Sequence, residues 1–318
     1  MNADLSVLDQ TERLIYALRA LYKQQGYSRY RMSKFEPYEL YSNNKDFLVS
    51  DSVLTFTDTN GRLMALKPDV TLSIIKNHRD DPEGLKKLCY NENVYRAAKA
   101  GPFREIMQAG LECIGAVESA CVGEVLLLAA ESLALAADNF VLAVSHLGIL
   151  SAFTGQVSPD PAVQQALIKC LGEKNLHGVE EVCRINGIDE TAARPLKMLM
   201  ALYGTYEEVL PGLKKLCTGR ELTAELTLLE EALQSLNNTE LAHRVFIDFS
   251  VVGDMNYYNG VLFKGFAAGV PDSVLSGGQY DRLMEKLGRK SKGIGFAVYL
   301  DRLERLSPRK GRDALWNC

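Results

Sequence analysis

Motifs for zinc and for nucleotides are missing from the sequence. The seven cysteines are scattered, and neither a C-x-x-C pair nor a Cys/His cluster has the spacing of zinc ligands. No G-x-G-x-x-G follows a first predicted strand, there is no Walker A sequence, and the G-I-G at 293–295 is too short to indicate nucleotide binding alone. We therefore expect no metal and no cofactor. We interpret Cys113, Cys121 and Cys183 as small core residues with reduced thiols.

Long apolar runs and a secretion signal are missing as well. The first ten residues contain Asp4 and Asp9 and no apolar stretch, so we expect no signal peptide. The longest apolar run, Val125–Ala137, is interrupted by Glu131 and is shorter than the roughly 20 residues that span a bilayer. These absences predict a soluble, cytoplasmic protein that does not bind a membrane.

An excess of positive charge is also lacking. The formal net charge is −4, whereas a dedicated nucleic-acid binder usually carries a basic domain or stripe. The two basic clusters, at 286–292 and 305–312, are typical of a solvated helix end and a frayed terminus. The charge balance therefore argues weakly against tRNA as a partner.

The residues that are present indicate an α+β fold. The chain has 318 residues, 47% of them hydrophobic, which suits about two domains or one large domain with an insertion. Strand patterns without regular βαβ alternation, together with segregated helical patterns, predict an antiparallel sheet flanked by helices. Helical spacing from 151 to 238 predicts a helical insertion, so that residues 1–150 and 239–318 would form the core.

Local patterns predict the individual elements. We expect helices at 8–25 and 124–137, and strands at 87–95, 106–114, 140–147, 244–252 and 257–266. Residues 27–40 look extended, an Asn60-Gly61 hairpin joins 53–57 to 63–66, and Gly277-Gly278 is interpreted as a turn. In the strand at 106–114, a period of two puts Gln108 and Glu112 on one sheet face.

Five segments of the chain carry recognisable motifs, two of which form a pair. They read LKPDVT at 66–71, NVYRAAKAGPFREIMQAGLECIG at 93–115, YYNG at 257–260 with SGGQYD at 276–281, and GIGFAVYLDRLERL at 293–306. In this order they resemble the L-R-P-[DE]-x-T stretch, motif 2, the R-G-L-D-Y-Y-x-G and A-G-G-R-Y-D signatures, and motif 3 of histidyl-tRNA synthetases. The resemblance covers residues 5–306 and implies the class II synthetase fold.

The resemblance also implies a pocket for free histidine. A buried ammonium needs oxygen acceptors because an unpaired buried charge is costly. By resemblance these acceptors would come from Asp69, Thr71, Gln108 and Glu112. Tyr257 and Tyr258 would form a flat apolar slot with polar ends for an imidazole. From the residues alone, the tyrosines also suit ordinary strand packing, and Gln108 and Glu112 also suit a solvent-facing sheet side.

The nucleotide side departs from the family pattern. Arg96 of motif 2 and Arg302 of motif 3 remain, and we interpret them as vestiges of a nucleotide site. Gly253 stands where R-G-L-D-Y-Y has its Arg, and a glycine does not stabilise charge on a transferring phosphorus centre. The other changes are Ala98 for the Glu of motif 2, Gln279 for the Arg of A-G-G-R-Y-D, Asp301 for the Glu of motif 3, and, on the amino-acid side, Asn256 for Asp. We expect a chain that holds an amino acid without activating it.

Twelve residues follow Leu306, fewer than the roughly 50 that an anticodon-binding domain needs. A histidyl-type fold of this kind resembles the regulatory subunits of ATP phosphoribosyltransferase. That resemblance implies a short-form catalytic subunit as partner, for whose activity this chain is required, in the first step of histidine biosynthesis. It also implies histidine as feedback effector, no tRNA, and a homodimer through motif 1 near Tyr30–Leu40 within a hetero-oligomer.

Two alternatives stay open from the sequence. Arg96 and Arg302 are compatible with a synthetase paralogue that activates an amino acid for a non-tRNA acceptor. A free-standing histidine-binding module with another partner is also possible. Spacing does not decide whether the segment 151–238 contacts a partner or only caps the sheet.

Overall fold

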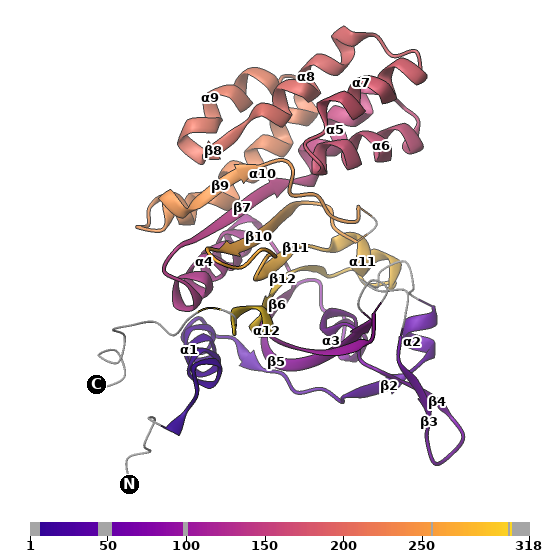
Figure 1. The fold of residues 1–318 in the computed structure, drawn as a ribbon, viewed down its shortest axis with the longest axis vertical. Coiled ribbons are helices and arrows are strands. Elements are labelled where there is room, and N and C mark those ends of the chain that lie inside the picture. The colour runs from indigo at the N-terminus through magenta and orange to yellow at the C-terminus, as the bar shows by residue number, and fades with distance from the viewer. Residues whose placement is uncertain (1–6, 44–52, 98–100, 256, 305, 307–318) are drawn as a thin grey trace.

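The computed structural model describes residues 7–43, 53–97, 101–255, 257–304 and 306 (Figure 1). Ala98 and Asn256 lie outside the described residues, as do the other residues of 98–100 between the strands predicted at 87–95 and 106–114.

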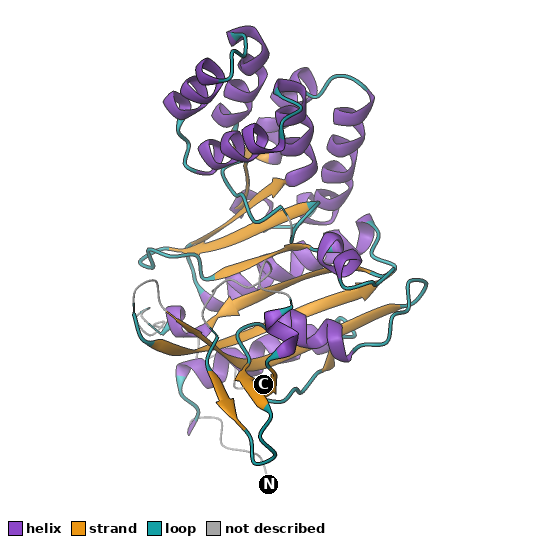
Figure 2. Cartoon of the chain, turned by 90° about the vertical axis from the view of Figure 1, so that its right-hand side faces the viewer, coloured by secondary structure: helices purple, strands orange, loops and turns teal. Residues whose placement is uncertain are grey.

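The centre of the molecule is one nine-stranded sheet (Figure 2). Its strands, in spatial order, are β1 (Ser28–Arg29), β5 (Leu85–Ala97), β6 (Phe103–Gly115), β12 (Lys292–Tyr299), β11 (Leu275–Gln279), β10 (Val261–Ala267), β7 (Phe140–His146), β9 (Val245–Asp248) and β8 (Tyr203–Thr205). A second, three-stranded sheet has the order β2 (Phe35–Pro37), β4 (Leu63–Leu66) and β3 (Thr55–Thr57). The predicted hairpin at Asn60-Gly61 is the β3–β4 turn, in which Gly61 has a φ of 77°.

The large sheet is mixed rather than wholly antiparallel. Every pairing from β5 to β7 is antiparallel, which confirms that the centre of the sheet is antiparallel, as expected. The pairs β1–β5 and β7–β9, nearer the two edges, are parallel. Parallel neighbours require a crossover connection, and the long chain segments between these strands supply one in each case.

Helices cover both faces of the sheet. Their bounds are α1 (Gln10–Gln24), α2 (Glu39–Ser42), α3 (Val70–Asn77), α4 (Ser119–Ala136), α5 (Leu147–Val157), α6 (Pro161–Gly172), α7 (Leu176–Ile185), α8 (Glu190–Ala201), α9 (Tyr206–Leu216), α10 (Arg220–Asn237), α11 (Asp281–Lys286) and α12 (Leu300–Leu303), with a 3₁₀ turn, η3, at Ala242–Arg244. Helix α1 begins at a capping box, in which the Asp9 carboxylate accepts from the Glu12 amide at 2.8 Å.

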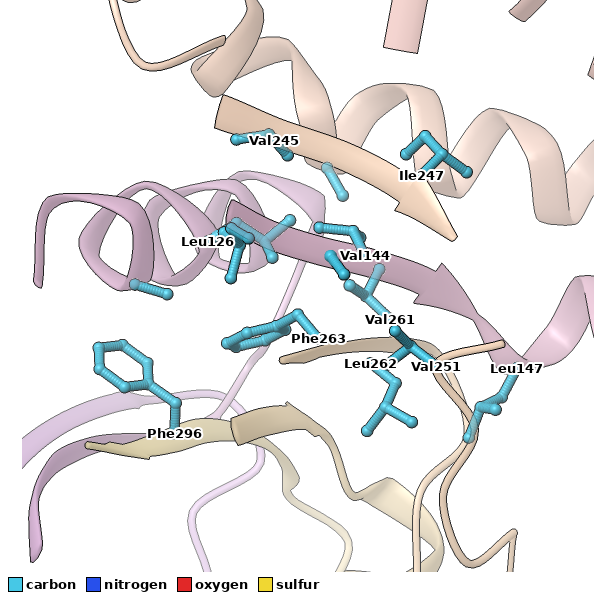
Figure 3. Close-up of a cluster of buried hydrophobic side chains, with 14 of the residues drawn as sticks. Leu126, Val144, Leu147, Val245, Ile247, Val251, Val261, Leu262, Phe263 and Phe296 are labelled. Carbon is cyan, nitrogen blue, oxygen red and sulfur yellow. The ribbon is translucent and has the colours of Figure 1, made fainter. Parts of the chain in front are cut away.

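The main core lies between α4 and the sheet. Leu126 of α4 points toward Val144 of β7 and Phe263 of β10, and Phe296 of β12 closes the cluster (Figure 3). The rings of Phe263 and Phe296 are 6.2 Å apart and steeply tilted. Among the described helices, α4 alone is long and apolar enough to cross a membrane, and 61% of its residues are buried within the molecule. Burial on several sides explains why its sequence is apolar nearly all round.

The segment after β7 is helical, as predicted, but it also contributes a strand. Helices α5 to α10 stack beyond the β7–β9 edge of the sheet (Figure 1). Strand β8, between α8 and α9, pairs antiparallel with β9 and forms the last strand of the sheet. The boundaries 1–150, 151–238 and 239–318 stay a proposal about the division of the chain.

Two local predictions were wrong. Gly277 and Gly278 form the middle of strand β11, not a turn. A Cβ on Gly277 would lie 2.3 Å from the Gly295 carbonyl oxygen, so the glycines permit close approach inside the sheet. The strand predicted from Tyr257 begins only at Val261, because the amides of Tyr257 and Tyr258 both donate to the Asp254 carbonyl in a turn.

Candidate functional site

A cavity of about 220 Å³ opens on the sheet face opposite α4. It lies between the first turn of α3, strands β6, β11 and β12, and residues 254, 257 and 258. All six residues predicted to bind histidine line it, and so does Arg96. They are Asp69, Thr71, Gln108, Glu112, Tyr257 and Tyr258. Sequence segments nearly 190 residues apart therefore meet at one site, of a size suited to a small molecule rather than a drug-sized one.

The first turn of α3 fixes one wall. Asp69 is the N-cap, and its Oδ1 accepts from the Leu72 amide at 2.9 Å. Its Oδ2 lies 3.7 Å from an Nη of Arg96, whose Nε donates to the Pro68 carbonyl at 2.7 Å. Asp69 and Arg96 therefore hold each other in place. The guanidinium of Arg96 has fewer free N–H donors for a ligand as a result.

Glu112 forms the floor of the cavity. Its Oε1 accepts from the Thr71 hydroxyl at 2.7 Å and its Oε2 from the Tyr280 hydroxyl at 2.6 Å. A Cβ on Gly295 would lie 2.0 Å from Oε2, so this glycine makes room for the carboxyl group. Burial raises the pKa of Glu112 from 4.5 to about 8, the two hydroxyl groups oppose that rise, and the nearby Asp69 adds to it. The carboxyl group of Glu112 is therefore largely protonated at neutral pH.

Gln108 presents a donor to the cavity. Its side chain is 2% exposed, and among the described residues its Nε2 has no hydrogen-bond partner. Buried polar atoms in native proteins almost always have partners, so an orphan that lines a cavity indicates where a ligand acceptor would lie.

Tyrosine rings line another wall. The rings of Tyr257 and Tyr258 are 4.5 Å apart with an interplanar angle of 46°, and Tyr280 lies 6.1 Å from Tyr257. Burial raises the pKa of all three hydroxyl groups, which stay neutral donors and acceptors. The wall combines apolar ring faces with polar tips, the combination that a planar heterocycle requires.

Sequence reasoning missed several lining residues: Tyr90, Asp254, Ser276, Tyr280 and Tyr299. Tyr280 belongs to the SGGQYD motif, so its signal was available. Tyr90 pairs with Gly110 in the β5–β6 register, and a Cβ on Gly110 would lie 2.6 Å from the Tyr90 hydroxyl. The space that Gly110 leaves between Gln108 and Glu112 is therefore taken by this ring.

Two departures from the synthetase pattern, Gly253 and Gln279, contact other parts of the protein, and the retained Arg302 lies outside the cavity lining. A Cβ on Gly253 would meet Leu262 and Tyr258 at 3.0 Å. The Oε1 of Gln279 accepts from the Val261 amide at 2.8 Å. Arg302 is not among the cavity-lining residues: its guanidinium donates to the Ser273 carbonyl and lies 4.3 Å from the centre of the Tyr299 ring.

Charge in the cavity is unbalanced. Asp69, Asp254 and the largely protonated Glu112 bring three carboxyl groups, whereas Arg96, paired with Asp69, is the one basic side chain among the described lining residues. No group of three His, Cys, Asp or Glu side chains is arranged to hold a metal within the described part of the chain. The site thus favours a ligand that carries a cationic group.

These features define the histidyl type of class II synthetase fold, and the sequence model of the histidyl-tRNA synthetase family matches residues 5–303. The chain belongs to this family, in the group of the ATP phosphoribosyltransferase regulatory subunits. It is 30% identical over 291 residues to the protein of that name from Caldanaerobacter subterraneus subsp. tengcongensis, with 90% of this chain and 75% of the relative covered. The Clostridium novyi protein of the same name is 28% identical over 95% of this chain and 75% of its own length.

Solved structures agree with this fold. An ATP phosphoribosyltransferase regulatory subunit/histidyl-tRNA synthetase from Bacillus halodurans superposes with a TM-score of 0.83 at 25% identity, over 98% of this chain and 83% of that one. A histidyl-tRNA synthetase from Nostoc sp. gives 0.77 at 18% identity, over 96% and 74%. A chain of the ATP phosphoribosyl transferase complex from Thermotoga maritima gives 0.70 at 18% identity, over 92% and 97%; these last two likenesses concern the fold alone.

Proposed function

We propose that this protein is the non-catalytic regulatory subunit of a cytoplasmic ATP phosphoribosyltransferase and that the cavity binds free histidine as its effector. The names of the relatives support the first part. One observation carries the second: a buried site has an orphan amide donor, three carboxyl groups and a tyrosine wall. A free amino acid with a heteroaromatic side chain satisfies all three.

The polar groups of the cavity divide into hydrogen-bond acceptors and a hydrogen-bond donor. Asp69, and Glu112 once it has lost its proton, are the acceptors that an ammonium or a ring N–H needs, because a buried cation without a partner is strongly disfavoured. Gln108 Nε2 supplies a hydrogen bond to an acceptor on the ligand. Tyr257, Tyr258 and Tyr280 enclose a planar ring.

The same site is poorly equipped to activate an amino acid. Adenylate formation places extra negative charge on phosphorus, which enzymes stabilise with positioned guanidinium groups or metal ions. Arg96 is engaged by the Pro68 carbonyl and by Asp69, Gly253 brings no side chain, and Arg302 contacts Ser273. Binding without activation is the outcome that this arrangement supports.

Regulation would follow from linkage. A ligand shifts an equilibrium between assembly states only by its differential affinity for them, typically about 1–3 kcal/mol. We propose a short-form catalytic subunit as the partner, dependent on this chain for its activity and slowed when histidine occupies the cavity. The assembly would contain a homodimer of this chain.

Reconstitution tests the proposal. The protein is mixed with a short-form catalytic subunit, and phosphoribosyl transfer is measured with and without histidine. We expect activity to rise on mixing and to fall with histidine, and calorimetry to record histidine binding to this chain alone. The Gln108→Leu variant should still activate the catalytic subunit but lose most of the histidine response. No complex and no activation would overturn the regulatory role.

One observation favours a second candidate, a synthetase paralogue that activates an amino acid for a non-tRNA acceptor: Arg96 lines the cavity. ATP–pyrophosphate exchange across the amino acids separates the two functions. We expect no exchange above background, and amino-acid-dependent exchange would favour the enzyme.

A further inference from the structure

Two thiols approach closely behind the ligand-binding strand. Cys113 of β6 follows Glu112, and successive strand residues face opposite sides, so its side chain points away from the cavity. There its Sγ lies 2.8 Å from the Sγ of Cys121, in the first turns of α4. A disulfide bond measures about 2.05 Å, so closure requires the sulfur atoms to move together by about 0.8 Å.

The hydrogen bond between the two thiols and the position of Cys121 at the start of α4 favour a thiolate at Cys121. Lys87 of β5 lies directly across from Cys113 in the sheet, and its Nζ donates to Glu124 at 2.6 Å, one turn after Cys121. Cys121 is the third residue of an 18-residue helix, where the helix dipole stabilises negative charge. The Cys113 thiol, as a hydrogen-bond donor, lowers the pKa of Cys121, and Lys87 lowers it further, against burial and Glu124.

Access to the pair is narrow. Cys113 is 0% exposed and Cys121 is 7% exposed. Low exposure of both thiols favours a small uncharged oxidant over a bulky disulfide such as oxidised glutathione.

We propose that Cys113 and Cys121 form an oxidation site, which hydrogen peroxide converts into an intramolecular disulfide. The Cys121 thiolate attacks one peroxide oxygen, the O–O bond breaks, and the departing hydroxide takes a proton to leave as water. The resulting sulfenic acid is attacked by Cys113: the S–S bond forms, the S–O bond breaks, and the hydroxyl group leaves as a second water with the Cys113 proton. Overall, two thiols lose two electrons and two protons, and one peroxide becomes two waters.

The product would join two elements that carry different parts of the molecule. Strand β6 bears Gln108 and Glu112 of the cavity, and α4 is the central core helix. A covalent link between them would restrain β6 from the side opposite the cavity, in which the proposed ligand would bind. The site itself depends on the two thiols and not on the identity of that ligand.

The experiment treats the full-length protein with hydrogen peroxide under native conditions, then quenches, unfolds and alkylates it. A background of Cys318→Ser removes the terminal thiol. Digestion with a glutamyl endopeptidase cuts after Glu112, Glu118 and Glu124, so each cysteine falls on its own peptide. We expect the two peptides to be recovered as one disulfide-linked species that dithiothreitol separates, while the buried Cys170 and Cys183 stay fully alkylated.

Variants with one cysteine replaced by serine show which thiol reacts in each oxidation step. In Cys113→Ser we expect a sulfenic acid on Cys121 that dimedone traps, and in Cys121→Ser we expect Cys113 to remain a thiol. The wild-type mapping does not depend on how these variants fold. If peroxide leaves Cys113 and Cys121 as alkylatable as Cys170 and Cys183, the proposal is overturned.

Discussion

The hydroxyl group of Tyr280 donates to Oε2 of Glu112 at 2.6 Å, across 168 residues of sequence. The contact requires two glycines on β12. A Cβ on Gly293 would lie 2.1 Å from the Tyr280 ring, and one on Gly295 would lie 2.0 Å from the Glu112 carboxyl group. Motif 3 therefore shapes the amino-acid side of the cavity through its missing side chains, while its Arg302 lies outside the lining.

The first prediction concerns pH and stability. Because the folded pKa of Glu112 is about 8 and its ordinary value is 4.5, the folded state binds more protons between these values. The stabilisation is full below pH 4.5 and is lost as pH rises toward 8. Relative to Glu112→Gln, which stays neutral, the free energy of unfolding of wild type should fall by about 1.4 kcal/mol per pH unit between pH 6.5 and 7.5.

Urea unfolding of both proteins at several pH values measures this difference. His146 is buried with a pKa lowered to about 4, so it contributes a slope of opposite sign below pH 6.5, and the comparison is made above that value. Parallel curves for the two proteins would contradict a raised pKa at Glu112.

A second prediction is that one substitution, Gln108→Leu, raises the stability of the protein and lowers its affinity for histidine. Gln108→Leu removes a buried donor that lacks a partner, so we expect the apo protein to gain about 1–2 kcal/mol. The same change removes a hydrogen bond to histidine and should weaken binding by roughly ten-fold or more. Thermal unfolding and calorimetry measure the two effects. Gln234→Leu on the exposed face of α10 is the matched control, with little change in either. Unchanged histidine affinity in Gln108→Leu would remove Gln108 from the site.

A third prediction uses two glycines. Gly295→Ala places a methyl group against Glu112 Oε2 and the Leu111 carbonyl, and should cost about 1–3 kcal/mol and abolish histidine binding. Gly155→Ala in helix α5 meets no atom closer than 3.9 Å and should stabilise by about 0.5–1 kcal/mol with normal binding. Chemical denaturation and calorimetry test both. Histidine binding by Gly295→Ala at wild-type affinity would show that the cavity floor is placed incorrectly.

A fourth prediction concerns the missing arginine. Gly253→Arg should leave ATP–pyrophosphate exchange at background, because Gln279 holds the Val261 amide and Arg302 remains on Ser273. The new side chain meets Tyr258 and Leu262, so histidine affinity should drop. Exchange that appears in this variant would mean that one residue alone separates the chain from a working ligase.

Sequence patterns predicted the core strands well because successive strand residues face opposite sides of a sheet, and in β6 both sides are buried from Gln108 to Gly115. They placed Gln108 and Glu112 together for the same reason. They failed at Gly277-Gly278, where glycine serves close strand packing, a property set by neighbours on β12 and β10 that a local window does not contain.

Residues of the candidate site could be predicted where they belong to a sequence motif. They could not be predicted where their position depends on contacts between residues far apart in the sequence. Tyr90 enters the cavity because it lies across from Gly110 in the β5–β6 register. Arg302 lies outside the lining because its guanidinium is drawn to the Ser273 carbonyl. The approach of Cys113 to Cys121 depends on how α4 lies on β6, which spacing alone does not specify.

Strand β8 has a mechanical consequence. Strand β8 lies within the segment of helices α5 to α10 and pairs with β9. Strand β9 pairs in turn with β7, and the sheet continues through β10 to β11. Helix α10 also packs on α4, so a rotation of these helices would have to break the β8–β9 backbone hydrogen bonds and separate α10 from α4, or else move the sheet with it. A rotation that kept both contacts would displace β9 and, through the sheet, the strand that carries Ser276 of the cavity lining.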